Sequence, residues 1–177
     1  MNKVFIATSL DGFIADDKGS VEFLYKYPEQ PGEDMGYYEF MDSVDALVMG
    51  RKTFETVLSF GVDWPYSKPV FVWTSEMKSV PSNLADKVHL INGNPSQIIQ
   101  QLNLLNYTNL YIDGGKTIQS FLEQDLIDEL TITTIPVLLG SGISLFGQLN
   151  HALYFNCIAS KCYLNGVTQS TFKRQAH

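Results

Sequence analysis

The chain has 177 residues, of which 45% are hydrophobic and 18% charged. This composition is typical of a globular protein and excludes a disordered tail, and the length fits one domain over residues 1–177. Twelve Lys and Arg against 19 Asp and Glu give a net charge of −7, which repels phosphate backbones and argues against nucleic acid as a partner. No apolar stretch approaches the length of a membrane span, and the N-terminus lacks a secretion-signal pattern, so we expect a cytoplasmic protein without a membrane partner.

The cysteines and histidines show no metal-binding pattern. Cys157 and Cys162 stand close together, with no further cysteine to build a zinc site or a disulfide framework. The three histidines, His89, His151 and His177, are scattered along the chain. We therefore expect two reduced thiols and no metal site.

The elements alternate along the chain. Apolar runs predict strands at residues 4–9, 46–49, 70–73, 88–91, 110–112 and 130–135, and helical spacing predicts helices at 33–43, 50–58, 95–105 and 117–123. Residues 19–32 are expected to form a long loop with a short element inside it. Near the end, segments 153–163 and 167–172 flank Asn165-Gly166, a hairpin turn signal. This order predicts a three-layer α/β domain with a mixed, mainly parallel sheet, helices on both faces and a C-terminal antiparallel hairpin.

The first candidate site is the junction where a buried strand ends at Gly50 and a helix begins with Arg51, Lys52 and Thr53. A helix N-terminus offers unpaired N–H groups and a partial positive charge, which suit a phosphate. Arg51 can add a bidentate contact. Taken alone, the junction could equally be an ordinary turn with a solvated helix end.

The second candidate is Gly114-Gly115-Lys116-Thr117, again between a strand and a helix. Paired glycines allow backbone amides to approach a pyrophosphate closely. Neither junction matches the Rossmann or P-loop pattern. Two such junctions in one small domain favour a dinucleotide over a mononucleotide.

Asp34 is the most informative carboxylate. The predicted helix places it with Tyr37, Tyr38 and Met41 on a face expected to be apolar. Burial there would raise its pKa and suit an acid that orients or protonates a nitrogen heterocycle. Alternatively, Asp34 caps the helix N-terminus, and the sequence leaves both interpretations open.

Several different motifs follow one another over nearly the whole chain. They are Ser9-Leu10-Asp11-Gly12, Met49-Gly50-Arg51-Lys52-Thr53-Phe54-Glu55, Asp113-Gly114-Gly115, Leu126-Ile127-Asp128-Glu129-Leu130 and Ile135-Pro136-Val137-Leu138-Leu139-Gly140-Ser141-Gly142. Together they resemble the dihydrofolate reductase superfamily, and in particular the C-terminal reductase domain of the bifunctional riboflavin-biosynthesis deaminase-reductase. The deaminase half with its zinc-binding cysteines is not in this sequence, so we expect a stand-alone reductase.

The resemblance implies an eight-stranded mixed sheet with NADPH lying across the two glycine junctions. The cofactor contacts carried over by position are Ala7, Gly50, Arg51, Lys52, Thr53, Thr74, Ser75, Gly114, Gly115, Lys116 and Thr117. Glu76 stands where many relatives place an arginine, which leaves Arg51 as the main cation for a 2′-phosphate.

The resemblance also assigns a substrate side. The helix carboxylate that holds the pterin in folate enzymes corresponds to Asp34, and the pterin-side threonine to Thr133. Tyr38, on the predicted face of Asp34, is a further expected substrate contact. For a substrate phosphate, Lys18, Lys26 and Lys161 are candidates only by elimination.

These residues predict an NADPH-dependent reductase that transfers hydride to a small heterocycle, with Asp34, or a water it orients, as the proton source. The expected reaction type is 5-amino-6-(5-phosphoribosylamino)uracil reduction, as in riboflavin biosynthesis. Two alternatives are a dihydrofolate or pterin reductase and a non-catalytic dinucleotide-binding protein. Relatives of the riboflavin type often pair, so a homodimer is also expected.

Overall fold

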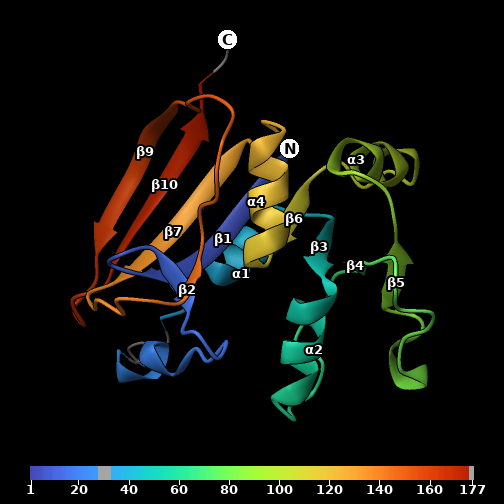
Figure 1. Cartoon of the computed structure of the whole chain (residues 1–177), viewed down its shortest axis with the longest axis horizontal. Helices are drawn as coiled ribbons and strands as arrows, with labels where there is room; N and C mark the ends of the chain where they lie inside the picture. Colours follow the sequence, from blue (N-terminus) through green and yellow to red (C-terminus); the bar gives the residue numbers. More distant parts are fainter. Residues whose placement is uncertain (28–32, 176–177) are drawn as a thin grey trace.

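The computed structural model describes residues 1–27 and 33–175 and is organised around one eight-stranded sheet. Its strands are β1 (Asn2–Ser9), β3 (Ala46–Gly50), β4 (Val70–Trp73), β5 (Val88–Ile91), β6 (Leu110–Asp113), β7 (Glu129–Ile135), β9 (Phe155–Cys162) and β10 (Thr168–Arg174). They lie in the order β5-β4-β3-β6-β1-β7-β10-β9 (Figure 1). The first six strands are mutually parallel, whereas β10 runs antiparallel to β7 and β9. The predicted fold class, a mainly parallel mixed sheet with a C-terminal hairpin, is confirmed.

Helices cover both faces of this sheet. Residues of α1 (Tyr37–Asp42) and α2 (Arg51–Ser59) join one buried cluster, and residues of α3 (Pro95–Leu104) and α4 (Gly115–Glu123) join another on the opposite face. Strand β3 feeds both clusters, because successive side chains of a strand point to opposite faces. Val48 packs with α3 and α4, whereas Leu47 packs with α1 and α2, and both are fully buried. Burial on both faces explains why this strand is an unbroken apolar run in the sequence.

Local signals fix several element ends. Helix α3 begins at Pro95 after a reciprocal capping box, in which Asn94 Oδ1 accepts from the Gln97 backbone N–H and Gln97 Oε1 accepts from the Asn94 backbone N–H, both at 2.9 Å. In the C-terminal hairpin, the Tyr163 N–H donates to the Val167 carbonyl at 2.8 Å around Gly166, whose φ is 84°. The predicted Asn-Gly turn is thereby confirmed.

The helix predicted at 33–43 is shorter than expected. It begins only at Tyr37, because Met35 (φ 50°) and Gly36 (φ 81°) adopt left-handed conformations that cannot belong to a right-handed helix. Asp34 therefore lies before the helix and not on its apolar face. Helix α4, by contrast, starts at Gly115, two residues earlier than predicted.

Several short elements escape the sequence patterns. Strands β2 (Phe13–Ala15) and β8 (Ile143–Ser144) form a separate two-stranded sheet. Two 3₁₀ helices, η1 (Glu22–Lys26) and η2 (Ser82–Leu84), complete the elements. The first of these is the short element expected within the long loop 19–32, whose residues 28–32 lie outside the described residues.

Among the described residues, no helix combines the length and apolar character needed to cross a bilayer.

Candidate active site

The sheet divides at the carboxyl ends of β1 and β6. Paired positions between these strands run only from Asn2 with Leu110 to Lys3 with Tyr111. Beyond them, β6 stays with β3 as far as Asp113, while β1 stays with β7 up to Ser9. The helices that follow β1 and β6 cover opposite faces of the sheet. Ligands of open α/β sheets bind in the crevice at such a switch point.

The two predicted glycine junctions meet beside this crevice. Gly114 has a φ of 90°, and a Cβ atom added there would collide with Oγ1 of Thr53. Reciprocally, a Cβ atom on Gly50 would lie 3.1 Å from Oγ1 of Thr117. Each junction thus accepts the threonine of the other, and the N-termini of α2 and α4 come together. Two adjacent helix N-termini whose glycines leave the backbone bare form a cradle that suits the phosphates of a dinucleotide.

The small β2–β8 sheet rests on this cradle. A Cβ atom on Gly115 would lie 2.8 Å from Cδ1 of Ile14 in β2, so any larger residue there would push the Ile14 side chain aside. On the other strand, the Ser144 carbonyl accepts from Nε2 of Gln119 in α4 at 2.8 Å. The turn after β1 and the segment after β7 are therefore packed against the start of α4.

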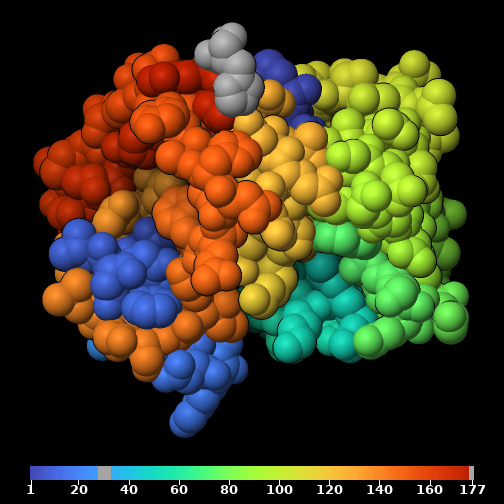
Figure 2. All heavy atoms as spheres, turned by 45° about the horizontal axis from the view of Figure 1, so that its top comes forward, coloured from blue at the N-terminus to red at the C-terminus, as the bar shows by residue number. Residues whose placement is uncertain are grey.

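Asp11 joins two motifs that are far apart in the sequence. Its carboxylate accepts from the Ser9 hydroxyl at 2.6 Å and from the backbone N–H groups of Leu139 and Gly140 at 3.1 and 2.8 Å. These hydrogen bonds, the one from Ser9 first, lower the pKa of Asp11. In Figure 2 the blue N-terminal segment and the orange segment around residue 140 lie against each other on one face.

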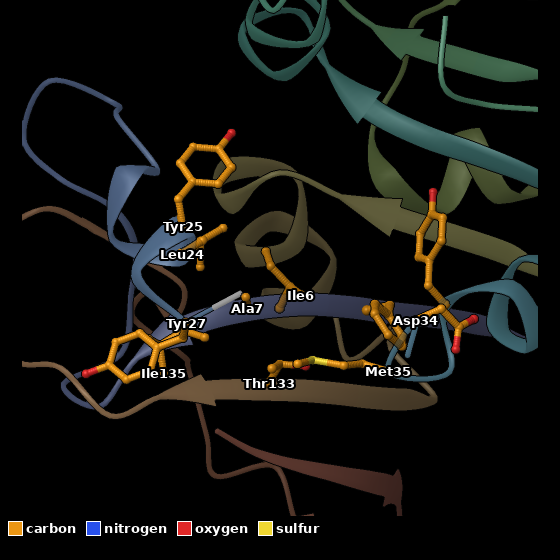
Figure 3. A pocket seen from close by; sticks show the side chains of 11 residues that line it. Ile6, Ala7, Leu24, Tyr25, Tyr27, Asp34, Met35, Thr133 and Ile135 are labelled. Atoms are coloured by element: carbon orange, nitrogen blue, oxygen red, sulfur yellow. The ribbon is translucent and has the colours of Figure 1, made fainter. Parts of the chain in front are cut away.

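A pocket of about 470 Å³ opens beside β1 and β7 (Figure 3). Its lining consists of Phe5, Ile6, Ala7, Leu24, Tyr25, Tyr27, Asp34, Met35, Tyr37, Thr133 and Ile135. The structure thus brings together Ala7, Asp34 and Thr133, as the sequence predicts. Tyr38 is 73% exposed and does not belong to this lining, in which Tyr37 stands instead. The difference follows from the late start of α1, which turns Tyr38 outward.

Asp34 does not have the properties of a buried acid. Its Oδ1 accepts from the Gly36 N–H at 3.0 Å, and its Oδ2 accepts from the Tyr38 N–H at 2.8 Å. These bonds, Tyr38 first, lower the pKa of Asp34, so the expectation of a raised pKa is wrong. The structure supports the alternative capping role, because the carboxylate holds N–H groups at the start of α1. It remains an acceptor at the pocket wall.

Asp113 is the candidate acid that the sequence patterns missed. Burial raises its pKa to about 6, opposed by a 2.8 Å hydrogen bond from the Gly114 N–H. Its charge in turn raises the pKa values of Tyr37, Tyr66 and Tyr111, after burial as the main cause. Asp113 itself is not among the residues that line the pocket, but its charge acts on Tyr37, which is. A carboxylate that ends an apolar strand directly before a glycine pair was the available signal.

The predicted 2′-phosphate contacts lie at the carboxyl ends of β3 and β4. Nη1 of Arg51 is 2.8 Å from Glu55, and Nη2 is 3.2 Å from Glu76. Thr74 Oγ1 accepts from the backbone N–H groups of Glu76 and Met77 at 3.1 and 3.2 Å, and Ser75 beside it is exposed. The main predicted cation is therefore already paired with two carboxylates.

The remaining predicted cofactor contacts lie on the helices. Lys52 and Lys116 are exposed in the first turns of α2 and α4, and Nζ of Lys116 donates to Oε1 of Gln119 at 3.3 Å. Thr117 is 3% exposed. Both lysines are thus exposed beside the helix N-termini, with Lys116 bound to Gln119, whereas Thr117 is fixed by packing.

Known proteins share this architecture. A family model described as the RibD C-terminal domain matches residues 3–168. The uncharacterized protein YwjB of Bacillus subtilis (strain 168) is 38% identical over 151 residues, which cover 84% of this chain and 83% of that protein. A structure from Shewanella sp. PV-4, provisionally named a riboflavin biosynthesis protein, has 51% identity and a TM-score of 0.95 over 99% of both chains.

More distant structures share the fold alone. A Thermotoga maritima diaminohydroxyphosphoribosylaminopyrimidine deaminase/5-amino-6-(5-phosphoribosylamino)uracil reductase has 16% identity and a TM-score of 0.72 over 99% of this chain and 56% of that chain. The dihydrofolate reductase of Enterococcus faecalis, solved with NADP(H) and RAB-propyl, has 17% identity and a TM-score of 0.68 over 99% of this chain and 97% of that chain. The family match over residues 3–168 shows that the chain belongs to the RibD C-terminal domain family.

Proposed function

We propose that this protein is a reductase that uses a nicotinamide dinucleotide, NADPH in the first place, to reduce a small ring compound in the pocket lined by Asp34 and Thr133. One observation carries the proposal: Thr117 lies against Gly50, and Thr53 lies against Gly114. These two contacts bring two helix N-termini together into one phosphate-binding cradle. Family membership supports the reaction class. The bound dinucleotide would supply the hydride, and the chain's own residues supply position and protons.

The cofactor-side residues fit this role. Backbone N–H groups at the starts of α2 and α4, with the side chains of Thr53 and Lys116, would hold the phosphates. Ala7 lies in the pocket wall on β1, where its backbone can contact the nicotinamide carboxamide. Ala7 follows the last paired positions of β1 and β6, so the pocket wall begins where these two strands part.

On the substrate side, two carboxylates have different tasks. Asp34, whose pKa is lowered, stays ionised and accepts a hydrogen bond from a ring N–H of the substrate. Asp113, whose pKa is raised to about 6, can hold a proton and deliver it, directly or through a water, to the substrate nitrogen or oxygen beside the carbon that is reduced. Different surroundings can push the pKa values of two carboxyl groups apart, so that one serves as the acid and the other stays ionised.

The family suggests 5-amino-6-(5-phosphoribosylamino)uracil as a first substrate, and the fold relatives suggest dihydrofolate or another pterin as a second. Both carry a C=N or C=O group that a hydride can reduce. A non-catalytic dinucleotide-binding protein would keep the cradle but would oxidise no cofactor with any acceptor.

Thermal unfolding with NADPH and with NADH tests the proposal first. A dinucleotide at 100 times its dissociation constant should raise the midpoint by roughly 5–10 °C for a domain of this size. A shift followed by acceptor-dependent oxidation of the cofactor supports a reductase, whereas a shift without oxidation by any acceptor supports the binding protein. The absence of a shift with either dinucleotide contradicts both.

A further inference from the structure

The pocket is poor in charge. Nine of its eleven lining residues are apolar or aromatic, and the other two are Asp34 and Thr133. None of these lining residues is Lys or Arg. Residues 28–32, which the structure does not describe, have the sequence Pro-Glu-Gln-Pro-Gly and contain no cation either.

The three lysines that could reach a substrate phosphate lie elsewhere. Lys161 is separated from Thr133 by Gln169 in the sheet register, at about 10 Å for two strand spacings. Its Nζ lies 3.3 Å from Glu33 and 4.1 Å from the centre of the Tyr163 ring.

Lys18 and Lys26 are exposed and stand outside the described lining. Lys26 stands between the lining residues Tyr25 and Tyr27 but is not itself part of the lining, and Lys161 is already paired with Glu33.

The electrostatic balance at the pocket is negative. Asp34 stays ionised, because two backbone N–H groups hold its charge, and the chain carries a net charge of −7. A phosphate or carboxylate that entered would lose hydration without gaining a cationic partner among the residues that line the pocket, which is unfavourable.

The lining favours a flat ring with a polar edge. Phe5 and Tyr37 meet edge to face with their ring centres 5.9 Å apart, and such aromatic walls stack well on planar ligands. Thr133 Oγ1 accepts from Nε2 of Gln169 at 2.9 Å, which leaves its own proton free to donate. A ligand edge would thus give an N–H to Asp34 and offer an acceptor to Thr133.

We infer that this pocket takes an uncharged, flat ring compound with an N–H donor at one edge and without a phosphate or carboxylate substituent. The inference rests on the proposed function for the identity of the site, and it narrows the substrate class. The phosphoribosyl group of the riboflavin intermediate and the glutamate tail of dihydrofolate would both be anions that meet no cation among the lining residues. The substrate is then a dephosphorylated or tail-free ring.

Calorimetric titration with matched pairs tests the inference. Pterin is compared with pterin-6-carboxylate, uridine with uridine 5′-phosphate, and a wider panel of neutral aromatic heterocycles with their anionic derivatives. We expect neutral members to bind at least about tenfold more tightly than their anionic partners, as expected for an uncompensated charge. An anionic member that binds as tightly as its parent overturns the inference, as does a panel in which no neutral ring binds at millimolar concentration.

A charge introduced at the pocket rim gives the converse test. Tyr25 lines the pocket and is 70% exposed, whereas Tyr154 is 65% exposed outside the lining, so Tyr25→Arg and Tyr154→Arg are a matched pair. Tyr25→Arg should tighten binding of pterin-6-carboxylate about tenfold, and Tyr154→Arg should leave it unchanged. Equal effects of both variants, or none from Tyr25→Arg, would overturn the inference. NADPH binding by the same samples is recorded separately. A failure of the cofactor proposal is thereby distinguished from a failure of the inference that the pocket excludes anionic ligands.

Discussion

The hydroxyl of Thr53 fills the space into which a side chain on Gly114 would project. Thr53 belongs to the first turn of α2, and Gly114 precedes α4, so this contact joins two strand-to-helix junctions that are 61 positions apart in the sequence. Bare backbone at Gly114 therefore serves two purposes at once. It lets the two helix N-termini approach each other, and it leaves N–H groups accessible to a ligand.

Replacing Gly114 with alanine should disturb both the fold and cofactor binding. The new Cβ atom collides with Thr53 and must also adopt a φ of 90°, so we expect a loss of about 2–4 kcal/mol in the free energy of unfolding from strain and collision together. Gly19→Ala is the matched control, since Gly19 has a φ of 82° and open space around its Cβ position. Urea unfolding and NADPH titration of both variants check this. Equal losses in the two variants would mean that the contact with Thr53 contributes nothing.

Asp113→Asn should abolish a pH dependence of turnover. If protonated Asp113 gives the proton, wild-type turnover falls as pH rises through about 6. The variant should turn over at least about 100-fold more slowly, and its pH–rate profile should show no fall near pH 6. Asn can still accept the hydrogen bond from the Gly114 N–H. The control is Asp45→Asn, whose carboxylate lies at the other end of β3 and binds the backbone of Thr108 and Asn109. A limb near pH 6 that persists in Asp113→Asn would remove Asp113 from the proton transfer.

The same substitution makes a separate prediction for stability. The pKa of Asp113 in the folded protein, about 6, lies above the ordinary aspartate value of 3.8, so the folded state binds the proton more tightly than the unfolded chain. The stabilisation is complete below about pH 4 and is lost as pH rises through about 6, an amount of about 3 kcal/mol for two pKa units. Asp113→Asn should remove this component, so the difference in unfolding free energy between variant and wild type should grow in favour of the variant from pH 4 to pH 7. A constant difference across that range would contradict the burial of the charge.

Glu76 should weaken the preference for a 2′-phosphate. Its carboxylate lies 3.2 Å from Arg51 and competes with any phosphate for that guanidinium. We expect Glu76→Gln to tighten NADPH binding about tenfold while NADH changes by less than about twofold. Glu123→Gln makes the same charge change at the far end of α4 and should alter neither affinity. If Glu76→Gln tightened both dinucleotides equally, Arg51 would not be reading the 2′-phosphate.

Asp34→Asn should separate the capping role from the ligand role. Asp34 accepts one hydrogen bond on each carboxylate oxygen, and Asn keeps a single acceptor oxygen, so we expect a loss of about 1 kcal/mol in the free energy of unfolding. Loss of the charge should lower kcat/KM for a reducible ring compound by about 10–100-fold, the range for one charge-assisted hydrogen bond. Asp42→Asn, at the exposed end of the same helix, is the control. An unchanged kcat/KM in Asp34→Asn would leave Asp34 with a structural role alone.

Much of the fold could be predicted because its buried strands appear in the sequence as apolar runs. Residues 46–49 are apolar without interruption, as expected for a strand covered on both faces. The start of α1 could not be predicted, because Met35 adopts a left-handed conformation that no local pattern demands. Strands β2 and β8, of three and two residues, exist through their contact with each other and with α4.

The candidate site was only partly accessible to the sequence. Both glycine junctions could be found as isolated helix starts, but their mutual packing depends on the crossover that brings β6 between β3 and β1. The raised pKa of Asp113 likewise arises from burial in the assembled fold, where its charge acts on Tyr37, Tyr66 and Tyr111 from three different segments. The homodimer and the cofactor contacts of individual residues stay predictions.

The carboxylate of Asp11 has a consequence for exchanging parts between members of the family. Because it binds the backbone of Leu139 and Gly140 and not their side chains, the later segment can vary in sequence as long as its chain path is kept. The turn at residues 9–12, by contrast, must keep an acceptor at position 11. Chimeras that transplant residues 136–146 from a relative should therefore fold when both parents carry an acid at that position, and a graft onto an Asp11→Ala background should lose the docking of the transplanted segment.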